Sequence, residues 1–299
     1  MISIIINPVA GGGTLAVAKQ RVERATQYLE ARGEHGDVHL TERRGHAHAL
    51  ASAAVQRGRS GVGAEASRVV AWGGDGTVNE IASALVGTQS VLGIVPAGSG
   101  NGLARELDLP TAVDAALDTA LSSPARSIDA GTLGDRWFFS IAGIGFDAHV
   151  ASAFDRATGR RGLSGYARIT ARELWRYECQ PYRVDGVGPR RAFLLTFANT
   201  TQFGNGARIA PGAQVDDGVL DFVVFEERSR LTTMWSLPRL FTGSVDRVRG
   251  VSITKVTSAV VESAVPMLFH VDGEPVQGGT RLEARIHPGV LRVAASRDR

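Results

Sequence analysis

Three times in its first third, the chain runs from a short apolar stretch into a glycine-rich turn. The stretches and their turns are Ile2–Ile6 with Asn7–Gly13, Val69–Trp72 with Gly73–Gly76, and Val91–Val95 with Pro96–Gly100. Residues with helical patterning follow each turn. This alternation predicts a parallel sheet with helices packed on it. Ligands of such sheets bind beyond the carboxyl ends of the strands, so the three turns are expected to meet at one edge.

The second half of the chain has a different texture and predicts a second domain. Its strand-like runs are Trp137–Ile141, Ala192–Phe197, Leu220–Phe225, Val251–Val256, Met267–Val271 and Leu282–Ile286. Helical patterns interrupt them only near Gly162–Glu178 and Leu231–Thr242. Short strands separated by turns are typical of a β-sandwich. With a boundary near Ser122–Pro124, we expect an α/β domain over residues 1–123 and a β-sandwich domain over residues 124–287.

Composition narrows the class of partner. Of 299 residues, 43% are apolar and 21% charged, a balance that allows a hydrophobic core without disulfides or structural metal ions. Cys179 is the only cysteine. The net charge of +3 is compatible with nucleotides, anionic membranes or nucleic acid. We find no nucleic-acid-binding motif and expect no such partner. Without a leader or a membrane-spanning apolar run, the expectation is a cytoplasmic protein that meets membranes only at their surface. The oligomeric state stays open, a homodimer included.

The glycine turns are suited to holding phosphate. Glycines let backbone N–H groups approach phosphate oxygens, and the helix that follows adds its positive end. The Asn7–Gly13 turn alone is weak evidence, since many such turns only connect a strand to a helix. Asp75, between two glycines, could orient a magnesium-bound phosphate, accept a proton, or simply cap the next helix. Ser99 and Asn101 could reach a phosphate or a ribose. Three such turns together favour a nucleoside triphosphate.

A family resemblance extends this interpretation. The motifs are NPVAGGG, GGDGTVNE, PAGSGNGLAR, GIGFDAHV, PGAQVDDGVLDFVV and VDGEP, in that order from Asn7 to Pro275. Together they resemble the catalytic domain shared by diacylglycerol, sphingosine and ceramide kinases. The resemblance implies a Rossmann-like nucleotide-binding domain followed by a β-sandwich, as in the NAD kinase-like superfamily, with an active cleft between them. It also implies that about residues 288–299 return to the first domain, and that ATP phosphorylates a lipid hydroxyl.

The same resemblance assigns site residues. Positions that match nucleotide-binding positions are Asn7, Pro8, Gly11, Thr41, Gly74, Asp75, Gly76, Thr77, Asn79, Glu80, Ser99 and Asn101. The catalytic carboxylates would be Asp75, Asp272 and Glu274, and which of them accepts the proton stays open. The Asp272–Pro275 stretch could also be a solvated hairpin turn.

A structural magnesium ion is a further implication of the resemblance. Its ligands would be the Asp217 carboxylate and the carbonyl oxygens of Gln214 and Val219. A plain hairpin turn over Asp216–Gly218 is an equal alternative.

The stretch Arg160–Cys179 is the sequence's best match to a membrane-contacting helix. One face would carry Leu163, Tyr166, Thr170, Leu174 and Tyr177, and the opposite face Arg161, Arg168, Arg172 and Arg176. The alternative is an ordinary surface helix with its apolar face in the core and its arginines in water, which the short apolar stripe with Thr170 favours. The partners expected from the whole pattern are thus a lipid substrate and a membrane surface.

Substrate preference is less constrained. Sphingosine kinases carry an aspartate for the substrate amine shortly after the GF pair, and the ungapped alignment places His149 there. This favours a neutral lipid such as diacylglycerol. Alternatives are a sphingoid base, NAD or another small metabolite, or a nucleotide-binding lipid carrier without turnover.

Overall fold

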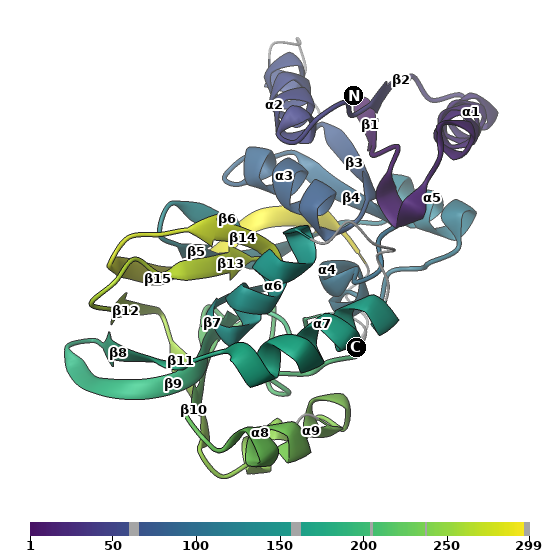
Figure 1. Cartoon of the computed structure of the whole chain (residues 1–299). Helices are drawn as coiled ribbons and strands as arrows, with labels where there is room; N and C mark the ends of the chain where they lie inside the picture. The colour runs from purple at the N-terminus through teal and green to yellow at the C-terminus, as the bar shows by residue number, and fades with distance from the viewer. Residues whose placement is uncertain (60–65, 157–162, 204–205, 237, 296–299) are drawn as a thin grey trace. The chain divides into compact units, whose positions relative to one another are not determined.

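The computed structural model describes residues 1–59, 66–156, 163–203, 206–236 and 238–295, so Arg161 and residues 296–299 lie outside it. The chain divides into two compact units (Figure 1). Unit 1 comprises Met1–Ile128 and Gly289–Arg299, and unit 2 comprises Asp129–Pro288. The predicted fold class, an α/β domain followed by a β-sandwich-like domain, is confirmed.

Unit 1 is built on a parallel sheet. In the order β2–β1–β3–β4–β15, its strands are Gly36–Leu40, Ile2–Ile6, Arg68–Gly73, Val91–Pro96 and the end of Arg281–Ala294. The strands β1, β3 and β4 are almost wholly buried, which explains why their sequences are continuous apolar runs. All four neighbouring pairs in this sheet are parallel, which confirms the predicted parallel sheet.

Helices cover this sheet. They are α1 (Leu15–Ala31), α2 (His46–Arg59), α3 (Asp75–Leu85), α4 (Gly102–Glu106) and α5 (Val113–Ser122), with a 3₁₀ turn η1 at Ala10–Gly12. Helix α1 begins after Thr14, whose hydroxyl accepts a hydrogen bond from the N–H of Val17. Ala25 and Leu29 of α1 and Leu117 of α5 join one apolar cluster with Ile4 of β1.

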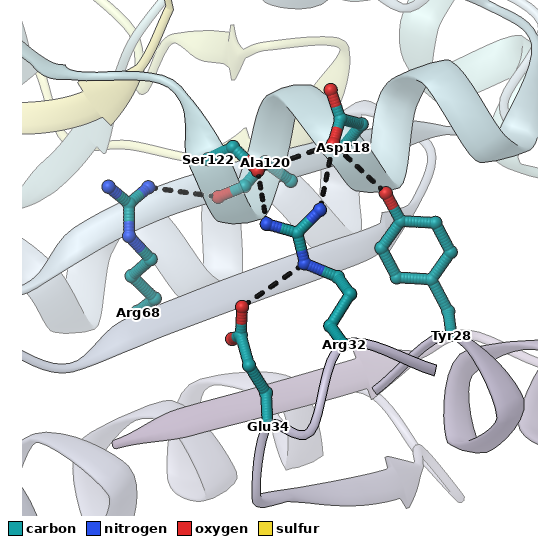
Figure 2. A network of polar contacts seen from close by, with 7 residues as sticks. All are labelled: Tyr28, Arg32, Glu34, Arg68, Asp118, Ala120 and Ser122. Atoms are coloured by element: carbon teal, nitrogen blue, oxygen red, sulfur yellow. Dashed lines mark hydrogen bonds and ion pairs between the residues drawn. The ribbon is translucent and has the colours of Figure 1, made fainter. Parts of the chain in front are cut away.

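A polar network joins the end of α1 to the end of α5 (Figure 2). Arg32 donates to Asp118 at 3.0 Å and to Ser122 at 2.8 Å, and Tyr28 donates to the same aspartate at 3.1 Å. Arg68 of β3 donates to the carbonyl oxygens of Ala120 and Ser123, which belong to the end of α5. Cations at a helix C-terminus satisfy its last carbonyl groups and complement its dipole. The network therefore fastens both helices to the amino-terminal end of the sheet.

Unit 2 is dominated by antiparallel strands. They are the end of β5 (Ala125–Leu133), β6 (Arg136–Phe138), β7 (Ile141–Gly145), β8 (Gln180–Val184), β9 (Val187–Ala198), β10 (Leu220–Glu226), β11 (Val251–Val256), β12 (Ser258–Glu262), β13 (Leu268–Val271), β14 (Glu274–Gln277) and most of β15. Its helices are α6 (Phe146–Arg156), α7 (Leu163–Arg176), α8 (Arg230–Ser236), α9 (Pro238–Phe241) and the 3₁₀ turn η2 (Val245–Arg247). The long strand β9 pairs with β7, β8 and β10 and contributes to two apolar clusters.

Two predicted elements are divided in the structure. The expected strand Trp137–Ile141 is interrupted because the N–H groups of Phe139, Ser140 and Ile141 bind a side-chain carboxylate at its middle. The expected helix Leu231–Thr242 becomes α8 and α9, and α9 begins at Pro238, whose ring cannot continue a helix. Among the described residues, no helix has both the length and the apolar character needed to span a membrane.

Candidate functional site

The three glycine turns of unit 1 interlock at the carboxyl ends of β1, β3 and β4. The backbone of Gly98 passes so close to Gly74 that a Cβ atom on Gly98 would lie 2.6 Å from the Cα atom of Gly74. A Cβ atom on Gly11 would lie 2.6 Å from the carbonyl oxygen of Ala97. Glycine is therefore required at these positions because backbone meets backbone. The predicted meeting of the turns at one edge is confirmed.

Side-chain hydrogen bonds reinforce the contact between the turns. The Nδ2 group of Asn7 donates to Oγ1 of Thr77 at 2.9 Å, which joins the first turn to helix α3. Asn101, in a left-handed conformation with φ of 52°, both accepts from the N–H and donates to the carbonyl oxygen of Gly98. The hydroxyl-bearing Ser99 lies exposed at the tip of the loop that Asn101 closes. Four of the predicted nucleotide-binding residues therefore lie in the interlocked turns and the start of α3, namely Asn7, Thr77, Ser99 and Asn101.

Asp75 joins the second turn to the third. Its Oδ2 atom accepts from the N–H of Asn101 at 2.9 Å, and Oδ1 accepts from the N–H of Gly102 at 2.6 Å. The aspartate thus sits at the start of α3 while its carboxylate holds the start of α4. Asp75 therefore caps α4, whereas the sequence alternative was a cap of the helix that directly follows its turn. The other two alternatives, orienting a magnesium-bound phosphate and accepting a proton, remain compatible with this geometry, because a carboxylate oxygen that accepts one hydrogen bond keeps a second lone pair. Gly76 and Asn79 follow in the first turns of α3, and Pro8 lies half-buried in the first turn.

Glu80 and Thr41 lie on a neighbouring loop. The carboxylate of Glu80 accepts from the N–H groups of Gly45 at 2.8 Å and Ala47 at 3.1 Å, so it caps the start of α2. Thr41 donates its N–H to the carbonyl oxygen of Ile6, at the end of β1. The hydrogen bonds that Glu80 makes to Gly45 and Ala47 therefore support loop 41–48, which follows β2, rather than the three glycine turns.

Arg21 stabilises the first turn, and no motif in the sequence marks it. Its guanidinium donates to the carbonyl oxygens of Asn7 and Ala10, each at 3.0 Å. Partial burial lowers its pKa from the ordinary value. The position lies one turn into α1 and follows a helical pattern, so nothing local distinguishes it from a surface arginine.

In unit 2, Asp272 lies in the tight turn between β13 and β14. Its carboxylate accepts three backbone hydrogen bonds, from Phe139 at 3.0 Å, Ser140 at 2.8 Å and Ile141 at 3.0 Å. The same residue has φ of 47° and donates its own N–H to the carbonyl oxygen of Ile141. Glu274 begins β14 two residues later and is half-buried. The stretch is therefore a hairpin turn, but the Asp272 carboxylate is bound by backbone N–H groups and not simply solvated.

A buried histidine–aspartate pair supports this turn and was not expected from the sequence. Nε2 of His270 lies 3.4 Å from Oδ2 of Asp147, which also accepts from the hydroxyl of Thr196 at 2.9 Å. On its other side, Nδ1 of His270 accepts from the N–H of Gly273 at 3.3 Å. A Cβ atom on Gly143 would lie 1.9 Å from Asp147, so glycine is required there. The pair therefore connects the start of α6 to the Asp272 turn.

In the loop predicted to bind magnesium, a lysine side chain of the protein pairs with the carboxylate. The ammonium group of Lys255 lies 2.6 Å from Oδ2 of Asp217, and Oδ1 of the same carboxylate accepts from the N–H of Val219. Across the described residues, no group of three or more His, Cys, Asp or Glu side chains is placed to hold a metal. In the loop that includes Gln214, the Asp217 carboxylate that the predicted ion would use is thus paired with the Lys255 ammonium group. The magnesium site stays a prediction.

Comparisons with known proteins identify the chain. Residues 1–133 match the diacylglycerol kinase catalytic domain, and residues 140–295 match the YegS C-terminal NAD kinase beta sandwich-like domain. The chain belongs to the YegS-like and diacylglycerol kinase family of lipid kinases. A protein of Chromohalobacter salexigens named "Probable lipid kinase YegS-like" is 33% identical over 92% of this chain and 88% of its own. A protein of Mycobacterium tuberculosis named "Diacylglycerol kinase" is 32% identical over 87% of this chain and 84% of its own.

Solved structures agree with this lipid kinase fold. A crystal structure of a diacylglycerol kinase from Bacillus anthracis superposes with a TM-score of 0.72 at 18% identity. A second crystal structure from the same organism gives 0.78 at 21% identity. Each covers 99% of this chain and 97% of its own. At these identities the likeness shows the fold alone.

In this lipid kinase His149, which the sequence analysis compared with the aspartate of sphingosine kinases, is paired internally. Nε2 of His149, on α6, lies 2.9 Å from Oε2 of Glu173, on α7. Nε of Arg172 lies 2.8 Å from the other oxygen of that carboxylate. The hydrogen bond from His149, reinforced by Arg172, holds the pKa of Glu173 below its usual range. Arg172 is thereby paired with its neighbour on α7, while Arg168 and Arg176 of the same helix are exposed.

Proposed function

We propose that this lipid kinase transfers the γ-phosphate of ATP to the hydroxyl of diacylglycerol or a similar neutral lipid. The observation that carries the proposal is the interlocking of three glycine turns at the ends of β1, β3 and β4. Contacts between glycine backbones fix the loops before any ligand binds. Preformed N–H groups of this kind hold phosphate oxygens at little cost in conformational freedom.

Unit 1 is assigned the phosphate donor. Backbone N–H groups after Gly74 and around Ser99 would bind the phosphates, together with the positive end of α3. Asp75 would keep the second and third turns in register through its two hydrogen bonds. Bound with the nucleotide, magnesium would neutralise phosphate charge, as phosphoryl transfer generally requires.

Unit 2 is assigned the proton acceptor, and Glu274 is preferred over Asp272. If Asp272 moved to take a proton, three backbone N–H groups would lose their acceptor. In the reaction the lipid oxygen bonds to the γ-phosphorus, and the bond between that phosphorus and the bridging oxygen of ADP breaks. The hydroxyl proton passes late in the reaction to the Glu274 carboxylate.

The pairing of His149 with Glu173 supports a neutral acceptor. An ammonium-bearing sphingoid base would need a carboxylate of its own to offset its desolvation. Glu173 already faces both His149 and Arg172, so its charge is compensated within the protein. A glycerolipid hydroxyl makes no such demand.

The proposal is tested in four reactions with γ-labelled ATP in detergent, three with diacylglycerol, a sphingoid base or NAD as the acceptor and one without an acceptor. We expect label in phosphatidic acid at a rate well above the other three. Label mainly in the sphingoid base would assign the alternative lipid, and label mainly in NAD would remove the protein from lipid chemistry. Nucleotide binding without label in any product would indicate a carrier that lacks turnover.

A further inference from the structure

Helices α8 and α9 present large apolar side chains to solvent. On α8, Leu231 is 57% exposed, Met234 40% and Trp235 80%, and on α9 Phe241 is 58% exposed. The three residues of α8 are spaced by three and four positions, so they share one face of the helix. Figure 1 shows both helices beyond the end of β10, at the margin of unit 2. We call Leu231, Met234, Trp235 and Phe241 the α8–α9 surface.

The buried face of α8 is polar, the reverse of an ordinary surface helix. Thr233 and Ser236 are the buried residues of this helix. The Ser236 hydroxyl donates to the carbonyl oxygen of Thr232 at 2.7 Å, which satisfies it within the helix. The sequence therefore places its large apolar residues where they contact water and its small ones where they contact protein. An exposed apolar patch of this kind marks a binding surface.

Positive charge surrounds this surface. Residues 228–249 hold five arginines, at positions 228, 230, 239, 247 and 249, against one acidic residue, Asp246. The segment's net charge is therefore +4, which is more than the +3 of the whole chain. The neighbouring acid Glu227 is already paired with Arg191 at 2.5 Å. The arginines are exposed or half-buried, so their charge reaches solvent.

We propose that the α8–α9 surface docks the protein on an anionic lipid bilayer. Tryptophan and phenylalanine favour the boundary between headgroups and acyl chains, and arginines add attraction to anionic lipids. A symmetric dimer through the same surface would bring two copies of the +4 segment together, and like charges oppose that contact. The inference rests in part on the proposed function, since an enzyme acting on a water-insoluble lipid must reach a bilayer.

The α8–α9 surface also adjoins a pocket of unit 2. Arg228, Arg230 and Thr233 line a hollow of about 280 Å³, together with Leu174, Tyr177 and Phe193. Arg191 of β9 and the acids Glu178 and Glu227 line it as well, so apolar side chains and charges of both signs share the lining. Docking through α8 and α9 would therefore bring an amphipathic hollow to the bilayer, which accords with a lipid acceptor.

The test uses the full chain and co-sedimentation with vesicles. One set is phosphatidylcholine alone, and the other contains about one third phosphatidylglycerol. We expect binding to the anionic set only, weakened by salt. Replacing Leu231, Trp235 and Phe241 with serine should weaken that binding at least tenfold, because buried apolar area is lost. Arg239→Gln with Arg247→Gln and Arg249→Gln should weaken it about a hundredfold at low salt.

Matched controls and a spectroscopic readout complete the test. Val187→Ser with Val265→Ser removes exposed apolar residues elsewhere in unit 2, and Arg183→Gln with Arg281→Gln removes exposed charge. Both controls should bind vesicles like the wild type. The emission of Trp235 should shift to shorter wavelength on anionic vesicles, and Trp235→Phe should lose most of that shift while retaining most binding.

The outcomes separate this inference from the proposed function. Equal sedimentation of the wild type and both α8–α9 variants would overturn the docking surface. So would a wild-type dimer that these variants convert to monomers, since the surface would then join two copies. If the wild type phosphorylates no lipid in detergent but docks as described, the proposed function fails and the docking surface stands. If the variants phosphorylate detergent-dispersed lipid normally but not vesicle lipid, both stand.

Discussion

The ammonium nitrogen of Lys255, on β11, lies 2.6 Å from Oδ2 of Asp217 and 3.7 Å from Oδ2 of Asp221. Burial raises the pKa of Asp221, and Lys255 counteracts part of that rise. One lysine thus compensates two carboxylates at the loop where the sequence predicts magnesium. It is one of only two lysines in the chain, the other being Lys19.

Replacing Lys255 with methionine should make this loop responsive to magnesium. We expect Lys255→Met to lower the free energy of unfolding by about 1 kcal/mol near neutral pH. The loss should shrink as pH falls through the raised pKa of Asp221, because a protonated carboxyl needs no cation. Millimolar magnesium without nucleotide should then stabilise the variant more than the wild type. Thermal unfolding over a range of pH and magnesium concentration measures all three effects.

Lys19→Met is the matched control, since it removes the other, exposed lysine. It should unfold like the wild type with and without magnesium. If magnesium stabilises the wild type as strongly as Lys255→Met, the ion binds despite the lysine, and the prediction from sequence is right.

Asp75→Asn tests the link between the second and third turns. An asparagine would present an NH₂ group to one of the N–H donors that now face the carboxylate. We expect turnover to fall by at least a hundredfold and the free energy of unfolding to fall by about 1–2 kcal/mol. A rise in the KM for ATP with kcat unchanged would show a role in nucleotide binding alone. Wild-type kinetics in both parameters would remove Asp75 from the site, and exposed Asp135→Asn is the control.

Substitutions at Asp272 and Glu274 should have different effects, the first mainly on stability and the second mainly on turnover. Asp272→Asn should lower the free energy of unfolding by about 1–3 kcal/mol, because three N–H groups lose an ionised acceptor. Glu274→Gln should unfold within about 0.5 kcal/mol of the wild type but lose most turnover. Calorimetry and labelled-ATP assays on both variants decide this. Full activity in Glu274→Gln would move the proton acceptor elsewhere.

Cys179 offers a test of burial in unit 2. Burial raises the pKa of its thiol to about 11, and it lies in the hollow lined by Tyr177 and Phe193. Because the thiolate is the reactive form, alkylation near pH 8 should be at least a hundredfold slower than for an ordinary thiol. The rate should rise about tenfold per pH unit up to that pKa. Mass spectrometry follows the single thiol, and the guanidinium-unfolded chain should react at the ordinary rate.

Local pattern was enough to predict much of the fold. Continuous apolar runs marked β1, β3 and β4 because both faces of a parallel sheet are covered. Glycines after those strands marked the turns, and the structure shows why, since backbone contacts backbone at Gly74 and Gly98. The break at Phe139–Ile141 could not be foreseen, because its cause is a carboxylate more than 130 residues away.

The same limit applies to the site. The motif containing Glu80 resembles a nucleotide-binding turn, yet its carboxylate caps α2, an element that the sequence patterns did not mark. In the sequence, His270 lies in an apolar strand pattern and Asp147 lies far from it, near the start of a helix. Only the packing of β13 on α6 brings the two side chains together. Lys255 likewise meets Asp217 across 38 residues. Such contacts are products of tertiary structure and carry no local pattern.

Strand β15 belongs to both units, pairing with β12 through residues 281–285 and with β4 through Arg292 and Val293. Gly87 and Pro124 also bond to backbone groups of residues 290 and 295. During synthesis, therefore, the parallel sheet of unit 1 stays one strand short until Arg292 and Val293 have left the ribosome. A chain truncated anywhere before residue 289 would lack the edge of the unit that was made first.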